Sequence, residues 1–232
     1  CNLGQSFCFL LSNSPLLKEL LIYRCWGLQT TYLSNVVCTS VRSLGIHGNM
    51  RKEIQIALLQ MCPAATLYHR HGGENADLSA VPATLEELLV DSCANVSAVQ
   101  LNKGLLRLAL KDVEIDDATL KQIMSNSPLL EVIMVVSNKV LTEDSISLIG
   151  DKYTETLQLL KLQSMPLLQH TVLEGICTKC KHLHTLEIGG NLQFPPSTAI
   201  DVLNWAPNLV KLDLSETRIS DAALQRIAQS NL

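Results

Sequence analysis

Residues 209–217 read LVKLDLSET, and this stretch decides the fold. Its apolar residues stand at the first, fourth and sixth positions, and a small polar residue stands at the ninth. Residues 183–191, LHTLEIGGN, repeat the pattern. The alternation in the middle of each stretch predicts a short strand with one buried face. The ninth residue, Thr217 or Asn191, marks the bend where the chain turns inward, because its side chain can bond backbone groups there.

Nine copies of this pattern run along the chain, spaced by 20 to 27 residues. The middle apolar residue of each copy sets its register, and we call it the anchor. The anchors are Leu20, Leu44, Leu67, Leu88, Leu108, Ile133, Leu160, Leu186 and Leu212. The third copy matches the pattern least well, because His69 and Gly72 occupy key places. A repeat of this length predicts a solenoid, in which each copy contacts only its neighbours.

The ninth position of the copies holds small or weakly polar residues. They are Cys25, Asn49, Cys93, Asn138, Asn191 and Thr217. Cysteine suits this place because it is small and readily buried. Cys62 and Cys180 stand in a second recurring place, just before a strand.

The segments between the strands predict helices in most copies. Apolar residues recur at helical spacing over residues 113–124, 141–149, 171–176, 195–203 and 219–227. Ser220 or Asp221 is a natural N-cap for the last of these. Residues 7–11 predict the helix of a partial repeat. Copies three and four have turn-rich connectors at residues 72–77 and 94–98, which predict irregular or 3₁₀ structure on the convex side.

These observations predict an α/β leucine-rich-repeat solenoid, curved, with parallel strands on its concave face and helices on its convex face. Residues 1–232 are expected to form a single solenoid of about nine repeats. The chain begins at Cys1 and ends just after a helical segment, with no polar capping unit in sight. We therefore expect a fragment of a longer chain.

The repeats resemble a known family. Residues 212–227 combine the strand pattern with an Ile-Ser-Asp helix start, Cys62-Pro63 precedes a strand, and Cys25 and Cys93 end strands. In these features the chain is similar to the cysteine-containing leucine-rich repeats of F-box/leucine-rich-repeat proteins. The resemblance implies a substrate receptor of a ubiquitin ligase, which contacts the ligase adaptor through a segment outside this chain. No F-box-like helical segment precedes the repeats, and several copies lack the Cys-Pro pair.

Composition and charge exclude several classes of function. Hydrophobic residues make up 47% of the chain but aromatic residues only 4%, which indicates an aliphatic core. A formal net charge of -4 leaves no basic footprint for nucleic acid. No run of 18 apolar residues is present, so we expect no membrane-spanning helix. Five of the eight cysteines occupy repeat positions without needing a bridge. We therefore expect reduced thiols and a cytoplasmic or nuclear location.

One stretch has the residue types of a metal site. Cys177-x-x-Cys180-x-His182-x-His184 offers thiolates and imidazoles, which are zinc ligands. Cys180 is also explained by its place before a strand, and a single C-x-x-C is a weak signal. The sequence shows no nucleophile elbow, phosphate-binding loop or HExxH helix. We therefore expect no catalytic residue, no metal and no cofactor. The HRH stretch at residues 69–71 is expected to be a solvent-facing polar cluster.

The residues that alternate with the buried positions are expected to line the concave face and to bind a protein or peptide partner. The predicted contact residues are Tyr68, Arg70, Leu89, Asp91, Arg107, Lys111, Val132, Met134 and Val136. An exposed apolar patch of this kind marks an interaction site. The alternative is that a flanking segment of the same protein covers the patch.

Three functions are compatible with this pattern. The first is a protein-recognition module, as in the substrate-binding region of an F-box-type ubiquitin ligase receptor. The second is a structural scaffold repeat in a large multiprotein assembly. The third is an innate-immune or pathogen-effector sensor domain. The sequence upstream of Cys1 would distinguish them, through an F-box or a nucleotide-binding domain.

Overall fold

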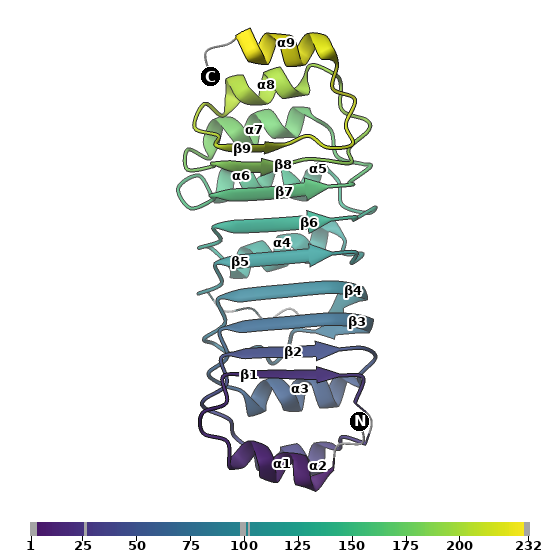
Figure 1. Cartoon of the computed structure of the whole chain (residues 1–232), viewed down its shortest axis with the longest axis vertical. Helices are drawn as coiled ribbons and strands as arrows, with labels where there is room; N and C mark the ends of the chain where they lie inside the picture. Colours follow the sequence, from purple (N-terminus) through teal and green to yellow (C-terminus); the bar gives the residue numbers. More distant parts are fainter. Residues whose placement is uncertain (1–3, 26, 98–100, 102, 230–232) are drawn as a thin grey trace. The chain divides into compact units, whose positions relative to one another are not determined.

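The computed structural model describes residues 4–25, 27–97, 101 and 103–229 (Figure 1). The chain divides into two compact units, which are described separately. Unit 1 comprises Cys1–Glu114 and Gln122–Ser127, and unit 2 comprises Ile115–Lys121 and Pro128–Leu232.

Unit 1 carries five parallel strands that pair in sequence order, with helices on one side (Figure 1). The strands are β1 (Glu19–Tyr23), β2 (Ser43–His47), β3 (Leu67–Asp77), β4 (Glu87–Ser97) and β5 (Arg107–Lys111). The helices are α1 (Gln5–Ser12), α2 (Thr30–Leu33) and α3 (Lys52–Met61). The helix expected over residues 7–11 is confirmed as part of α1.

Unit 2 carries four strands with the same parallel pairing and a helix after each one (Figure 1). The strands are β6 (Val132–Val136), β7 (Leu159–Gln163), β8 (Thr185–Glu187) and β9 (Lys211–Asp213). The helices are α5 (Glu143–Ile146), α6 (Leu148–Lys152), α7 (Thr171–Lys179), α8 (Thr198–Trp205) and α9 (Asp221–Gln229). Helix α4 (Asp117–Asn126) begins in unit 2 and ends in unit 1.

The predicted anchors set the strand register in eight of the nine copies. In unit 1, Leu20 pairs with Leu44 and Leu88 pairs with Leu108. In unit 2, Ile133, Leu160, Leu186 and Leu212 stand in one row across the four strands. Of these eight anchors, all but the half-buried Leu212 lie in the core. The α/β leucine-rich-repeat solenoid is therefore confirmed.

The third copy is the exception, and its predicted register was wrong by one residue. Leu44 pairs with Tyr68, and Tyr68 pairs with Leu88, so Tyr68 and not Leu67 is the anchor. Arg70 then takes the next inward position, between Ile46 and Val90. Both side chains are fully buried. An arginine in an apolar position is what hid this register from the sequence pattern.

The buried guanidinium of Arg70 holds the bend of its own repeat by bonding backbone carbonyl groups. Its Nη1 donates to the carbonyl oxygens of Ile46 at 3.2 Å, Gly48 at 2.9 Å and His71 at 3.0 Å. Gly73 occupies the ninth position, where a Cβ atom would lie 2.6 Å from Nη2 of Arg70. The missing side chain at Gly73 thus makes room for the guanidinium, which satisfies the buried carbonyls in its place.

Other bends use the residues that the sequence predicts. Asn191 donates from Nδ2 to the carbonyls of Leu162 and Ile188 at 2.7 and 2.8 Å, and its Oδ1 accepts from the Met165 amide at 2.8 Å. Asn138 uses its amide group in the same way. These side chains satisfy buried backbone groups, so the asparagine positions stabilise the turns between repeats.

A second feature of each bend was not visible in the sequence. The fourth residue after the anchor has a positive φ angle in all nine copies. These residues are Arg24, Gly48, Gly72, Ser92, Asp112, Ser137, Ser164, Gly190 and Glu216. Only three are glycine, so the strained backbone of the turn is imposed by the repeat and not by local preference.

The connectors of copies three and four correct another prediction. They form neither irregular nor 3₁₀ structure at residues 72–77 and 94–97. Instead β3 and β4 continue as strands of 11 residues, and their second halves pair from Gly73 with Cys93 to Asp77 with Ser97. In the part of the chain that the structure describes, no helix directly follows β3 or β4, and the pairing of their second halves satisfies the backbone hydrogen-bonding groups there instead.

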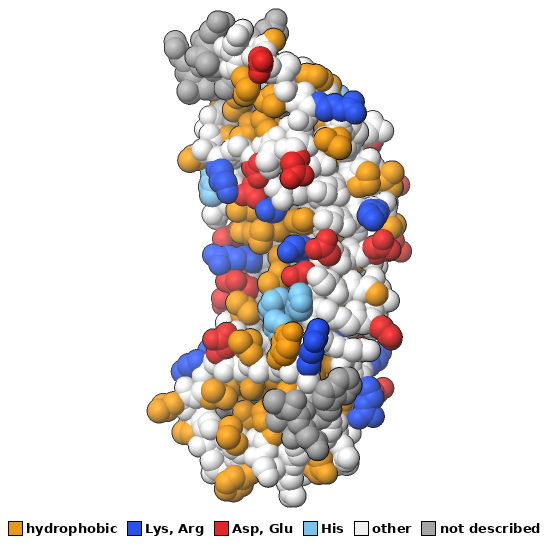
Figure 2. Space-filling view, turned by 45° about the vertical axis from the view of Figure 1, so that its right-hand side comes forward, with side chains coloured by type: hydrophobic (Ala, Val, Ile, Leu, Met, Phe, Trp, Pro, Cys, Tyr) orange, Lys and Arg blue, Asp and Glu red, His pale blue; other side chains and the backbone are white. Residues whose placement is uncertain are grey.

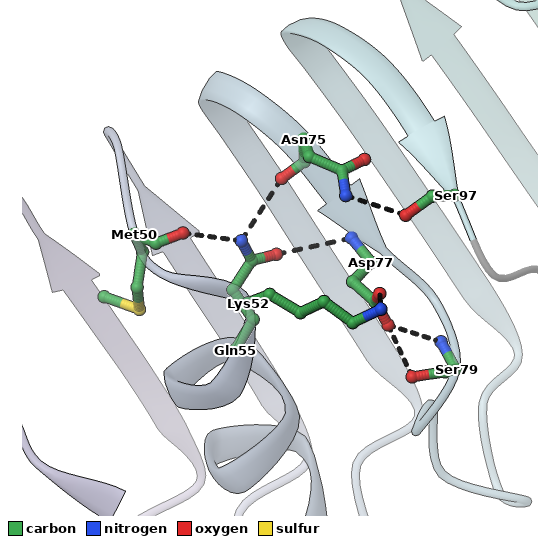
Figure 3. Close-up of polar contacts among 7 residues, drawn as sticks. All are labelled: Met50, Lys52, Gln55, Asn75, Asp77, Ser79 and Ser97. Carbon is green, nitrogen blue, oxygen red and sulfur yellow. Dashed lines mark hydrogen bonds and ion pairs between the residues drawn. The ribbon is translucent and has the colours of Figure 1, made fainter.

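A buried glutamine attaches the second half of β3 to α3 (Figure 3). Gln55 donates from Nε2 to the carbonyl oxygens of Met50 at 2.8 Å and Asn75 at 3.2 Å. Its Oε1 accepts from the amide of Asp77 at 3.4 Å. Helix and strand therefore share one polar network inside unit 1.

The carboxylate of Asp77 closes this network (Figure 3). It is fully buried, pairs with Lys52 Nζ at 2.9 Å and accepts from the Ser79 amide at 3.0 Å. Burial raises the pKa of Asp77, but the hydrogen bonds from Ser79 and Lys52 and the Lys52 charge outweigh it, so the pKa lies below its ordinary value.

The helices of unit 2 follow the prediction closely, with one break. Residues 141–149 form α5 and α6, separated at Ser147, instead of one helix. Thr142 caps α5 by accepting from the Asp144 amide. Ser220 accepts from the Ala223 amide, which confirms it as a cap of α9.

Candidate functional site

The candidate site is the face of each sheet that the helices leave uncovered, which we call the open face. Side chains alternate between buried and exposed along β1 and between buried and half-buried along β6. The outward positions in unit 1 belong to Glu19, Leu21, Tyr23, Ser43, Gly45, His47, Leu67, His69, His71, Glu87, Leu89, Asp91, Arg107, Ala109 and Lys111. Those in unit 2 belong to Val132, Met134, Val136, Leu159, Lys161, Gln163, Thr185, Glu187, Lys211 and Asp213.

Seven of the nine predicted contact residues occupy outward positions. They are Leu89, Asp91, Arg107 and Lys111 in unit 1, and Val132, Met134 and Val136 in unit 2. Tyr68 and Arg70 do not, and their predicted place on the open face was wrong. The one-residue shift in the third copy turns both inward and brings His69 and His71 outward in their stead.

Strand β6 presents an apolar row on the open face of unit 2. Val132, Met134 and Val136 are half-buried, while Ile133 and Val135 between them are buried. Leu159 of β7 pairs with Val132 and extends the row sideways. A strand that faces solvent on one side is expected to alternate apolar and polar residues. This strand is apolar on both sides, so its outward side chains serve something other than the core.

The rest of the open face of unit 2 is polar or charged. Glu187 lies between Lys161, at 2.8 Å, and Lys211, with which it forms a second ion pair. Hydrogen bonds from Lys161 and Lys211 hold the pKa of Glu187 below its ordinary value. Gln163 donates to Asp213 at 3.0 Å. This polar network borders the apolar row of β6 through the pairing of Met134 with Lys161.

Unit 1 carries a different group on its open face, a cluster of three histidines and an aspartate. Figure 2 shows the histidine side chains gathered in one patch. The ring centroids of His47 lie 4.9 Å from His69 and 5.3 Å from His71. Nδ1 of His71 lies 3.3 Å from Oδ2 of Asp91. Each of His69, His71 and Asp91 offers one ligand atom, and these atoms lie within 4.8 Å of one another.

The electrostatics of this cluster favour the neutral forms of His47 and His69 and the ionised form of Asp91. Burial, followed by the charges of His71 and Arg70, lowers the pKa of His47. Burial and the neighbouring imidazoles likewise lower the pKa of His69. Burial raises the pKa of Asp91, but hydrogen bonds from Ser92 and His71 and the charge of Lys111 outweigh it, so that pKa lies below its ordinary value.

Sequence reasoning missed this cluster as a site. His69 and His71 were expected to be polar surface, and Asp91 only a partner contact. The signal was present in the H-x-H spacing of residues 69–71, which places two imidazoles on the same face of a strand. It became informative only with the correct register, in which His71 pairs with Asp91.

The cysteine–histidine stretch of unit 2 does not form such a cluster. Cys177 and Cys180 are buried, and burial raises the pKa of Cys177 to about 12 and that of Cys180 to about 11. His182 is exposed and lies 3.8 Å from Glu155. Within the described residues, His69, His71 and Asp91 are the group that meets the geometry of a metal site.

Comparisons with known proteins identify the fold and no family. No protein-family model matches the chain, and no curated protein matches it. Among solved structures, one similar chain is the plant peptide hormone receptor RGFR1, in complex with RGF2, with a TM-score of 0.50 and 18% sequence identity. The match covers 94% of this chain and 34% of that one, so this chain spans about a third of the receptor's length. At this identity the likeness shows the leucine-rich-repeat fold.

No helix among the described residues is long and apolar enough to cross a membrane.

Proposed function

We propose that this chain is a non-enzymatic protein-recognition module that binds a protein or peptide segment on its open face. The observation that carries the proposal is the apolar row of β6. Val132, Met134 and Val136 lie on the outward side of the strand, yet all three are apolar and partly exposed. Apolar side chains grouped on a surface mark interaction sites, because burying them against a partner removes apolar area from water.

The charged residues around the row suit the rim of such an interface. Lys161, Glu187 and Lys211 form a fixed polar network at one border. Rim charges tune the rate and specificity of association more than its affinity. We therefore expect Met134 and its apolar neighbours to supply most of the binding free energy.

The test compares two substitutions of the same kind. Met134→Glu places a carboxylate in the middle of the β6 row. Leu148→Glu places one on α6, where Leu148 is 39% exposed on the helical side. We expect Met134→Glu to weaken partner binding by about 2 kcal/mol, roughly thirtyfold, as for a hot-spot residue. Leu148→Glu should bind like the parent chain.

Equal binding by Met134→Glu and Leu148→Glu would contradict the proposal. The binding surface would then lie on the helical side or in a flanking segment. Binding is best compared by quantitative capture from cell extract, followed by measurement with the purified partner.

The finer proposal is the substrate-binding region of an F-box-type ubiquitin ligase receptor in the cytoplasm or nucleus. Its support is the cysteine pattern. Cys62 and Cys180 are buried just before strands, and Cys93 is buried at a bend. Cys93 Sγ lies 3.5 Å from the carbonyl oxygen of Gly72 and donates to it. Each of the cysteines that the structure describes is a free thiol.

Two other roles for the same fold lead to different complexes. A structural scaffold would copurify in fixed stoichiometry with its assembly, and a sensor or effector domain would be joined to a nucleotide-binding domain or secretion signal. The receptor of similar fold was determined with RGF2 bound. Mass spectrometry of proteins that copurify with the full-length protein is the test, and a ubiquitin ligase adaptor is the expected result. A fixed assembly without ligase components would favour the scaffold instead.

A further inference from the structure

We propose that His69, His71 and Asp91 bind one divalent transition-metal ion, with Zn²⁺ as the ion best suited to these ligands. The proposal concerns a different unit from the apolar row of β6 and does not depend on the protein-recognition role. It replaces the expectation from sequence that the chain binds no metal.

The sheet itself brings the three side chains together. His69 and His71 lie two residues apart on β3, so both point to the open face. Asp91 lies directly beside His71 on β4, in register. Ligands on paired strands are held more rigidly than ligands on loops. The backbone therefore fixes the spacing before any metal arrives.

The distances suit a tetrahedral ion after small side-chain rotations. Zinc bonds of about 2.0–2.2 Å to nitrogen and oxygen place tetrahedral ligand atoms about 3.4 Å apart. His71 Nδ1 and Asp91 Oδ2 are 3.3 Å apart. The whole set of ligand atoms lies within 4.8 Å. Two imidazoles and a carboxylate are a donor set that transition metals accept.

His69 has bonding capacity that the protein leaves unused. Its Nε2 atom is buried and has no hydrogen-bond partner among the residues that the structure describes. An unsatisfied buried polar atom destabilises the folded state. A metal ion at the cluster would give this ring a ligand role and offset that cost.

The surroundings support the ligands. Ser92 Oγ donates to Asp91 Oδ1 at 2.7 Å, which orients the carboxylate. The ring of His47 packs beside both histidines of β3 and would shield a bound ion on that side. Gly45 lies two residues before His47 on β2. A Cβ atom at Gly45 would lie 3.3 Å from His47 Nε2, so the missing side chain leaves room for the imidazole.

Two cations lie near the cluster. The guanidinium of Arg70 is buried on the opposite side of the sheet, bonded to backbone carbonyls. Lys111 pairs in register with Asp91 and is exposed on the open face. Its charge acts on the Asp91 carboxylate, so it competes electrostatically with a bound ion. Replacing Lys111 with glutamine should therefore tighten metal binding.

The experiment is calorimetric titration of the chelator-treated chain with ZnCl₂. The proposal predicts one Zn²⁺ per chain and a rise in thermal stability with Zn²⁺ concentration. His71→Ala and Asp91→Asn should each weaken binding at least tenfold, since the loss of even an outer partner of a metal ligand costs about 10–100-fold. Both side chains face outward, and circular dichroism will show whether the variants remain folded.

The matched control is His182→Ala. His182 is also an exposed histidine near a carboxylate, with its Nε2 3.8 Å from Glu155 Oε2, but among the described residues it belongs to no set of three ligand atoms with metal-site spacing. This variant should bind Zn²⁺ like the parent. The absence of one-to-one binding would overturn the proposal. So would binding that Asp91→Asn leaves unchanged, or binding lost instead on Cys177→Ser.

Discussion

The open faces of the two units are built on the same strand register but carry opposite chemistry. Unit 1 presents a polar cluster in which His69, His71 and Asp91 have metal-ligand geometry and His47 lies beside them. Unit 2 presents the apolar row of β6. The inward positions are aliphatic in both units, except for Tyr68 and Arg70 of β3. The repeat thus constrains the inward side chains. The outward side chains can differ between the two units and are available for recognition.

The bends between repeats also differ in residue type while meeting one structural requirement. Unit 2 closes its turn at Asn191 with one amide side chain. Unit 1 closes the turn of its third copy with Arg70, which reaches over Gly73. Two different side chains satisfy the same kind of buried carbonyl group, so the requirement is on hydrogen bonding and not on residue type.

The largest effect is expected from a charge in the core of unit 2. Leu186 is fully buried between Leu160 and Leu212. Leu186→Asp buries an unpaired carboxylate, which costs several kcal/mol. We expect thermal unfolding of Leu186→Asp, measured by circular dichroism, to show no cooperative transition. A variant that melts like the parent would contradict the assigned register.

A substitution of Arg70 should be the next most costly. Arg70→Met leaves the carbonyls of Ile46, Gly48 and His71 without their shared donor, at about 3 kcal/mol in unfolding free energy. Asn191→Ala in unit 2 should cost about the same, because three hydrogen bonds are lost there too. Denaturant unfolding measures both. If Arg70→Met were neutral, the two bends would not be equivalent.

Smaller effects should follow the ion pairs of the open faces. The pKa of Glu187 is lowered from 4.5, so its stabilisation is complete above pH 4.5 and is lost as pH falls through the lowered pKa. Glu187→Gln should cost about 1.5 kcal/mol at pH 7, and the difference from the parent should shrink in acid.

The matched change in unit 1 is Glu87→Gln. Its pair with Arg107 is largely exposed, at 39% and 56% of the two side chains. Such pairs contribute about 0–1 kcal/mol. Unfolding free energies measured at pH 7 should therefore fall further for Glu187→Gln than for Glu87→Gln. Equal losses in the two variants would argue against the buried character of the Glu187 network.

The smallest effects concern the left-handed turn residues. Glu216 has φ of 55° and Gly48 has φ of 90°. Glu216→Gly should stabilise the chain by about 0.5 kcal/mol, because glycine adopts this conformation without strain. Gly48→Ala should destabilise it by about 1 kcal/mol for the converse reason. In thermal melting, the melting temperature should therefore rise for Glu216→Gly and fall for Gly48→Ala. A loss on Glu216→Gly would show that the turn is not strained.

Much of the fold could be predicted from the sequence, because inward positions repeat at fixed spacing. Leu186 and the other anchors predicted the strands, and Asn191 and Asn138 predicted the asparagine bends. Apolar residues at helical spacing predicted most of the helices. The third copy could not be read correctly, since Arg70 fills an apolar position and a glycine, Gly73, replaces the usual side chain at the bend. That one-residue shift also concealed the histidine cluster, which depends on contacts between strands that no single stretch of sequence displays.

The central claim is that inward side chains hold the fold while outward side chains are free for recognition, and β6 offers the most direct test. Val135 is buried and Met134, its neighbour, points to the open face. Thermal unfolding of Val135→Glu and Met134→Glu compares the same charge on the two sides of one strand. We predict that Val135→Glu loses the cooperative transition, as an unpaired buried charge should, while Met134→Glu melts within a few degrees of the parent, about 0.5 kcal/mol or less. Equal destabilisation by both would contradict the claim.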